Sequence, residues 1–73
     1  MDLQKIYSQV NFLILALEKN NYYEESKILK NALYSGITSG EIFDNLKECL
    51  KEIKKIKIFK NDCKMILREI NRI

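Results

Sequence analysis

The side chains that could carry out chemistry in this 73-residue chain are two cysteines and one pair of adjacent carboxylates. The chain contains no histidine, so the commonest general base and metal ligand is missing. Cys49 could act as a nucleophile only beside a base, and lysine is the sole candidate type. Glu24 and Glu25 would point about 100° apart on a helix, so we expect them to favour a helix start. The sequence therefore predicts a protein that is not an enzyme.

Cofactor and metal sites are not predicted either. No C-x-x-C pair occurs, and the two glycines, Gly36 and Gly40, fit a turn and not a phosphate-binding loop. Both cysteines lie on apolar stripes, where a free cysteine packs as a small hydrophobe. A disulfide between them is disfavoured in a reducing compartment. We expect no cofactor, no metal and two cysteines in the core.

Composition indicates one soluble domain that spans residues 1–73. The chain is 47% apolar and 32% charged, which is typical of a globular protein. Its size gives a stability margin of only a few kcal/mol. The longest apolar run, residues 12–17, is six residues long, against about 18 for a membrane span. Asp2 and the amphipathic residues after it do not resemble a signal peptide. We expect a cytoplasmic protein without a membrane partner.

Hydrophobic periodicity predicts an all-α fold, a small antiparallel helical bundle. We expect three longer helices, at about 2–19, 22–35 and 39–57, and a short C-terminal helix at about 62–73. Asp2 would cap the first helix, and Asn20-Asn21 would end it because asparagine tolerates the left-handed conformation. Phe12, Leu15 and Ala16 widen the apolar stripe of this helix, so we expect it to be buried on more than one side.

The turn between the second and third predicted helices carries the strongest local signals. Thr38 and Glu41 fit a capping box, in which the hydroxyl accepts from the Glu41 N–H and the carboxylate reaches back. Gly36 is placed to end the second helix in the left-handed conformation, with Ile37 folding back on Ala32. The short connection predicts that these two helices are antiparallel neighbours.

Two interpretations fit the residues after Ile56. The apolar repeat could continue in one helix, or the chain could turn around 59–62 with Asn61 or Asp62 as a new cap. A single helix of about 35 residues would span roughly 50 Å, too long for the rest of the chain to cover. We therefore favour the turn.

Surface side chains are the remaining candidates for function. Tyrosine is amphipathic and favours interfaces, and Tyr22 and Tyr23 cannot both face the core. Residues 41–73 supply the whole net charge of +3, and residues 51–64 hold six lysines against two acids. The lysines spread around the predicted helix, so nucleic-acid binding is the weaker expectation. The candidate partner-binding residues are Tyr22, Tyr23, Tyr34, Lys47, Lys51, Lys54 and Lys55.

Residues 31–50 read N-A-L-Y-S-G-I-T-S-G-E-I-F-D-N-L-K-E-C-L. This segment resembles small helical immunity proteins of contact-dependent inhibition and other polymorphic toxin systems of bacteria. Their pattern is a helix ending in A-L, a short turn rich in glycine and serine or threonine, and then G-x-E-I and a long amphipathic helix. The matching residues, all of the turn and cap, are Gly36, Thr38, Gly40, Glu41 and Ile42.

The resemblance implies a non-catalytic protein that binds a cognate toxin domain, expected to be a nuclease, and occludes its active site or substrate access. The chain departs from the family in its basic charge, since many immunity proteins of nuclease toxins are acidic, and the toxin type stays open. Two alternatives remain: a nucleic-acid-binding regulator that uses the basic 51–64 face, and a self-associating adaptor or secretion chaperone that forms a homodimer.

Overall fold

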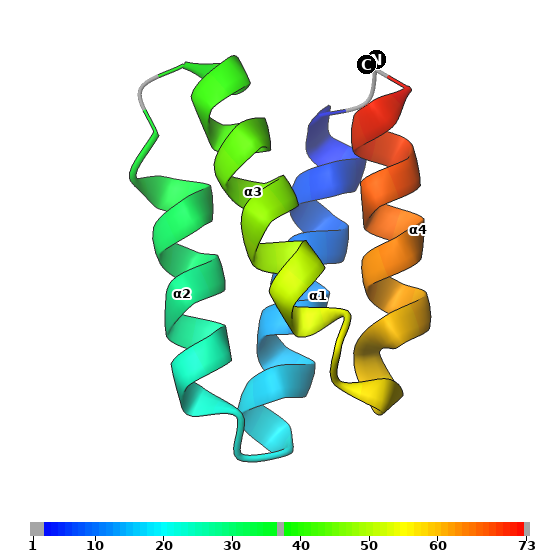
Figure 1. The fold of residues 1–73 in the computed structure, drawn as a ribbon. Coiled ribbons are helices and arrows are strands. Elements are labelled where there is room, and N and C mark those ends of the chain that lie inside the picture. The colour runs from blue at the N-terminus through cyan, green and yellow to red at the C-terminus, as the bar shows by residue number, and fades with distance from the viewer. Residues whose placement is uncertain (1–2, 37, 73) are drawn as a thin grey trace.

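A computed structural model of the chain, which describes residues 3–36 and 38–72, forms an up-and-down bundle of helices (Figure 1). Its elements are α1 (Leu3–Lys19), α2 (Tyr23–Tyr34), α3 (Ser39–Ile53), the short 3₁₀ helix η1 (Lys57–Phe59) and α4 (Lys60–Asn71). Consecutive α-helices run antiparallel, and the start of α1 lies beside the end of α4. The predicted all-α bundle is confirmed.

Each helix packs mainly against two others: α1 and α3 both contact α2 and α4. The core is almost entirely aliphatic, and each fully buried side chain contributes roughly 1.5–3 kcal/mol. The most deeply buried residues are Ile6, Val10, Leu13, Leu17, Leu29, Leu46, Leu50 and Cys63. Cys63 lies in the core as predicted, whereas Cys49 is only half-buried beside it.

The turn between α1 and α2 forms as the sequence predicts. Asn21 adopts a positive φ of 68°, the left-handed conformation. The Asn20 side chain donates from Nδ2 to the Ala16 carbonyl oxygen at 2.8 Å, and the Tyr22 N–H donates to the Leu17 carbonyl oxygen at 2.8 Å. Both carbonyl oxygens also accept from the Asn20 N–H at 3.2 Å, so these bonds reinforce the last turn of the helix.

The prediction for Gly36 is wrong in its mechanism. No glycine of the described chain has a positive φ, and Ser35 ends α2 with φ −101°. Gly36 is needed because Ile42 lies against it: a Cβ at residue 36 would come 2.6 Å from Ile42 Cγ1. The predicted contact of Ile37 lies outside the described residues, as does the predicted cap at Asp2.

The start of α3 confirms one half of the capping box. Thr38 is the N-cap in an extended conformation, and its Oγ1 accepts from the Glu41 N–H at 3.2 Å. The return bond from the Glu41 carboxylate stays a prediction. Helices α2 and α3 are antiparallel neighbours, as expected.

The chain breaks between α3 and α4, but earlier than predicted. Helix α3 ends at Ile53 and not at residue 57, and Ile56 is extended with ψ 117°. Helix α4 begins at Lys60, and its N-cap, Phe59, forms no side-chain cap bond. The proposed caps at Asn61 and Asp62 are therefore wrong, because both residues lie inside α4.

Packing of Phe59 explains the position of this break. Its ring is buried and meets the Tyr22 ring edge-to-face, with centroids 5.5 Å apart and planes at 87°. Neither glycine nor proline marks residues 54–59, so the bend is set by tertiary burial and not by local conformation.

Helix α1 buries one face only, against our expectation. Phe12 and Leu15 are 73% and 65% exposed, whereas Leu13 and Ile14 between them are buried. Helices α2 and α4, which both pack against α1, cover the stripe from Ile6 to Leu17, and no further element of the described chain covers the other side.

Candidate interaction surfaces

Neither thiol is placed to act as a nucleophile. Burial, and then the charge of Asp62, raise the pKa of the Cys63 thiol to about 11, against an opposing effect of Lys54. Burial, and then the charge of Glu48, raises the pKa of the Cys49 thiol. Both cysteines are free, and both thiols are protonated at neutral pH. Within 3–36 and 38–72, no cluster of three or more potential ligand side chains could hold a metal ion.

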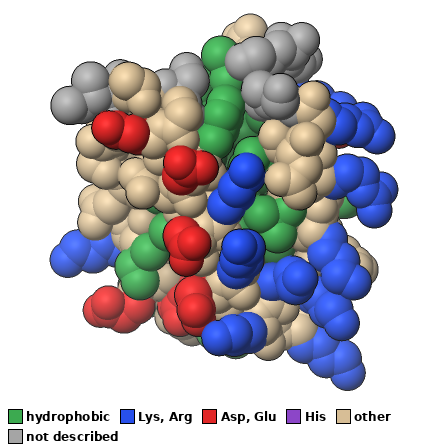
Figure 2. Space-filling view, turned by 45° about the horizontal axis from the view of Figure 1, so that its top comes forward, with side chains coloured by type: hydrophobic (Ala, Val, Ile, Leu, Met, Phe, Trp, Pro, Cys, Tyr) green, Lys and Arg blue, Asp and Glu red, His purple; other side chains and the backbone are tan. Residues whose placement is uncertain are grey.

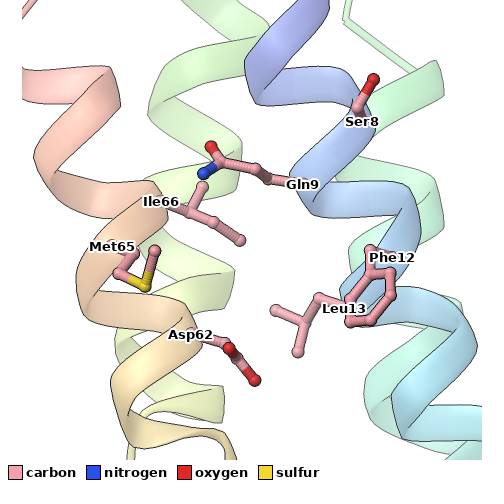
Figure 3. Close-up of a pocket in the computed structure, with 7 residues that line it drawn as sticks. All are labelled: Ser8, Gln9, Phe12, Leu13, Asp62, Met65 and Ile66. Atoms are coloured by element: carbon pink, nitrogen blue, oxygen red, sulfur yellow. The ribbon is translucent and has the colours of Figure 1, made fainter.

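A groove of about 340 Å³ opens between α1 and α4 (Figure 3). We call it the α1/α4 groove; its lining residues are Ser8, Gln9, Phe12, Leu13, Asp62, Met65 and Ile66. Leu13 and Ile66 are buried and belong to the core, whereas Phe12 and Met65 are 73% and 54% exposed. Large apolar side chains that are exposed to water therefore border the groove on both helices, as is typical of an interaction site.

Gln9 gives the α1/α4 groove a polar group without a partner. Its side chain extends from α1 toward α4 (Figure 3), and its Oε1 atom is buried with no hydrogen bond to any described residue. A buried acceptor left unsatisfied costs about 1–3 kcal/mol. Apolar walls with a few polar groups that can fix orientation are typical of a binding site.

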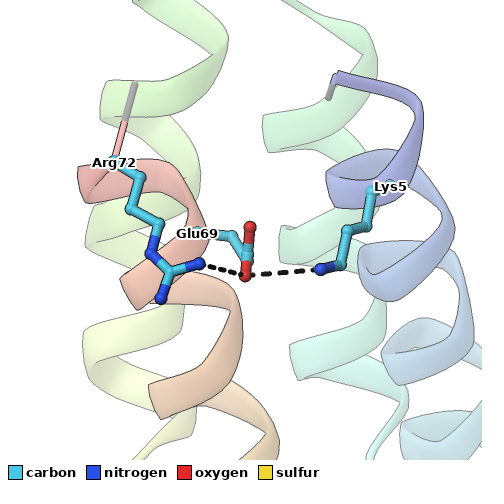
Figure 4. A network of polar contacts seen from close by, with 3 residues as sticks. All are labelled: Lys5, Glu69 and Arg72. Carbon is cyan, nitrogen blue, oxygen red and sulfur yellow. Dashed lines mark hydrogen bonds and ion pairs between the residues drawn. The ribbon is translucent and has the colours of Figure 1, made fainter. Parts of the chain in front are cut away.

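An ion-pair network joins α1 and α4 beyond the groove (Figure 4). Glu69 Oε1 lies 3.5 Å from Lys5 Nζ and 3.4 Å from Arg72 Nη1. Such surface pairs contribute about 0–1 kcal/mol each. Lys5 and Glu69 each lie about one helical turn from the groove residues Gln9 and Ile66, so the network fixes the helix spacing near the groove.

Charges on α4 are sorted by side. Its two acids face α1, since Asp62 lines the groove and Glu69 bonds to Lys5. Its cations recur every four residues at Lys60, Lys64 and Arg68, so they share a different side of the helix. Helix α4 is thus acidic toward α1 and basic on the side away from it.

Charges on α3 are sorted in the same manner. Glu48 and Glu52 line a second hollow together with Ile28 of α2, so they lie on the side toward α2. Lys54 lies close enough to Cys63 of α4 to influence its thiol, so it lies on the side toward α4. Lys47, Lys51 and Lys54 follow at helical spacing and form one stripe.

The two sets of cations form what we call the α3/α4 basic face: Lys47, Lys51, Lys54, Lys60, Lys64 and Arg68. Figure 2 shows Lys and Arg side chains gathered over α3 and α4, with the Asp and Glu side chains grouped toward α2. Lys47 and Lys54 are half-buried, whereas Lys51, Lys60, Lys64 and Arg68 are exposed.

The candidate tyrosines lie at the two ends of α2 and contact three different neighbours. Tyr22 is half-buried against Phe59, whereas Tyr23 is exposed, as expected for one of this pair. The Tyr23 hydroxyl donates to Asn21 Oδ1 at 3.2 Å, and the exposed Tyr34 donates to Asn11 Oδ1 at 3.3 Å. The tyrosines therefore do not gather into one patch.

The candidate lysines divide between two environments. Lys47, Lys51 and Lys54 belong to the α3/α4 basic face, while Lys55 is paired with Glu52 at 3.1 Å. Three of the four lysines are thus brought together, and cations of α4 extend their stripe.

Sequence reasoning missed Gln9, Phe12 and Met65 as surface candidates. Phe12 carried a usable signal, because its position on α1 lies far from the direction of Val10 and Ile14. Gln9 follows Ile6 by three residues and precedes Leu13 by four, so it is a polar residue beside an apolar stripe. Met65 carried the same kind of signal, because it follows Cys63 by two residues and lies off the stripe of Cys63, Ile66 and Ile70.

Comparisons with protein-family models, curated proteins and solved structures found no match. In the part of the chain that the structure describes, every helix is too short or too polar to cross a bilayer.

Proposed function

We propose that this chain is a non-catalytic immunity protein that binds a bacterial toxin domain through the α1/α4 groove and blocks its active site or substrate access. One observation carries the proposal: Phe12 and Met65 stand exposed beside a groove that also holds the unpartnered Gln9 Oε1. The resemblance of residues 31–50 to immunity proteins supports a toxin as the partner.

The composition of the groove fits a protein partner. Aromatic and methionine side chains are enriched at the centres of interfaces, where they are desolvated on binding. The partner would insert an apolar side chain between Phe12 and Met65. The Gln9 side chain, whose Oε1 is buried in the free protein, would turn toward the partner and accept an N–H from it. Because an unpaired acceptor is then satisfied, this hydrogen bond adds affinity and fixes the orientation of the partner.

Electrostatics favour the groove over the α3/α4 basic face if the toxin is a nuclease. A cleft that binds nucleic acid is basic, and like charges brought together cost several kcal/mol. The basic face would be repelled by such a cleft, whereas the groove side of α4 carries Asp62 and Glu69. The toxin type itself stays open.

The proposed site of action is the cytoplasm. Two free cysteines, Cys49 and Cys63, are compatible with a reducing compartment. The proposal includes no membrane partner. Self-association is not part of the proposal, and a homodimer would be recognised by its mass in solution.

Co-expression tests this proposal. The chain is produced together with the toxin domain encoded next to its gene, and we expect cell survival and a complex that co-purifies. Phe12→Ser combined with Met65→Ser should abolish both, while Ile58→Ser, which alters an exposed apolar residue outside the groove, should retain both. If the wild-type chain gives neither protection nor a complex, the proposal is wrong.

A further inference from the structure

We propose that the α3/α4 basic face binds the phosphate backbone of double-stranded nucleic acid without reading its sequence. The inference goes beyond the proposed immunity function and uses a different surface from the α1/α4 groove.

The six cations of this face are electrostatically free to meet a partner. Among residues 3–36 and 38–72, the ion pairs of the protein use Lys5, Lys30, Lys55 and Arg72, all outside the face. The cations of the face form no ion pair in that part of the chain. Four acids of α3 and α4 point elsewhere: Glu48 and Glu52 toward α2, and Asp62 and Glu69 toward α1. Asp44 is the exception, because it precedes Lys47 by three residues and so lies on the same side of α3.

The face has the dimensions of a short stretch of duplex. At 1.5 Å per residue, the row from Lys47 to Lys54 is about 10 Å long and the row from Lys60 to Arg68 about 12 Å long. The two rows lie on neighbouring antiparallel helices, whose axes in such bundles are roughly 8–10 Å apart. Duplex DNA carries one charge per about 1.7 Å of axis, so about 12 Å presents about seven phosphates. The six cations of the face are therefore close in number to the phosphates of a duplex segment of this length.

The chemistry of the face favours a duplex over other polyanions. Single-stranded nucleic acid is bound by stacking bases on aromatic rings, but the tyrosines lie on or beside α1 and α2. A protein interface needs a desolvated apolar or aromatic centre, and these six positions are all lysine or arginine. An anionic membrane surface is bound by a helix that also buries apolar side chains, which the basic rows do not supply. A phosphate backbone, by contrast, can be bound through charge alone.

Fluorescence anisotropy with a labelled DNA duplex of about 20 base pairs, titrated at several salt concentrations between about 50 and 200 mM, tests the inference. We expect log Kd to rise with log salt with a slope between about 3.5 and 5.5, which corresponds to four to six neutralised phosphates. An RNA duplex and a DNA duplex of scrambled sequence should bind within about threefold of the first, because phosphate contacts carry no sequence information.

Lys51→Glu with Lys64→Glu removes the centre of the face, and we expect at least a tenfold loss of affinity. The matched control, Lys19→Glu with Lys27→Glu, changes net charge by the same amount on α1 and α2 and should lose less than threefold. Circular dichroism of both variants establishes that they fold. No binding of the wild type at the lowest salt, an equal loss in both variants, or tighter binding to anionic lipid vesicles than to duplex would overturn the inference.

Discussion

Gly36 and Ile42 are in such close contact that a Cβ at residue 36 would lie 2.6 Å from Ile42 Cγ1 and 3.1 Å from the Ile42 backbone nitrogen. The contact brings the end of α2 against the first turn of α3. We therefore expect Gly36→Ala to lower the free energy of unfolding by about 1–3 kcal/mol, the usual cost of inserting an atom into a packed site. Urea denaturation followed by circular dichroism measures this change.

Gly40→Ala is the matched control for this prediction. Gly40 lies in the first turn of α3, and an added Cβ would meet only Thr38 Oγ1, at 3.9 Å. Alanine restricts the unfolded chain and favours helix, so we expect this variant to be more stable than wild type by about 0.5–1 kcal/mol. Equal effects of the two substitutions would contradict the steric role of Gly36.

Truncation of two adjacent residues of α1 should affect the stability of the fold to very different extents. Leu13 is 1% exposed and Leu13→Ala should cost about 2–5 kcal/mol, enough to unfold much of a small domain. Phe12 is largely exposed, so Phe12→Ser should change stability by less than about 0.5 kcal/mol. Thermal unfolding of both variants decides the matter, and a large loss for Phe12→Ser would mean that this ring supports the fold.

Gln9→Met should raise the stability of the fold and weaken binding to the partner. The substitution removes the buried Oε1 acceptor while keeping the length of the side chain, so we expect stability to rise by about 1 kcal/mol. Binding to the toxin partner should weaken, because the hydrogen bond that orients it is lost. A loss of stability on substitution would show instead that Oε1 is already satisfied, for example by an ordered water.

Cys63 should make the protein sensitive to alkaline pH. Its thiol has a pKa of about 11 in the folded protein against 9.0 as its ordinary value, so the folded state holds the proton more tightly. The stabilisation is complete below pH 9 and is lost as pH rises through 11, with a size of about 3 kcal/mol. Comparing wild type with Cys63→Val from pH 8 to 11 isolates this contribution, since lysines and tyrosines titrate in both proteins. Parallel pH profiles would contradict it.

Local signals in the sequence predicted the structure correctly where the conformation of a residue depends on its near neighbours in the chain. The left-handed Asn21, the cap at Thr38 and the buried stripe from Ile6 to Leu17 all follow from residue chemistry and helical spacing. They determine three helices and two turns of the bundle.

Tertiary packing determines the features that the sequence did not predict, namely the end of α3, the exposed side of α1 and the two surfaces. Lys54 and Lys55 are good helix formers, yet the helix ends at Ile53 because Phe59 must reach the core beside Tyr22. Phe12 and Leu15 are as apolar as their buried neighbours, so composition alone could not place them outside. The α1/α4 groove combines residues from helices that are distant in sequence, and the α3/α4 basic face combines residues from helices joined by a bend that lies earlier than predicted. Their existence depends on how the helices pack.

The sorting of acids toward α2 and cations toward α4 gives the molecule an electric dipole moment in addition to its net charge of +3. The field of an approaching polyanion exerts a torque on this dipole, which turns the α3/α4 basic face toward the polyanion before any contact forms. Rotational alignment of this kind shortens the search for a productive encounter. Low ionic strength should therefore accelerate association more than it slows dissociation.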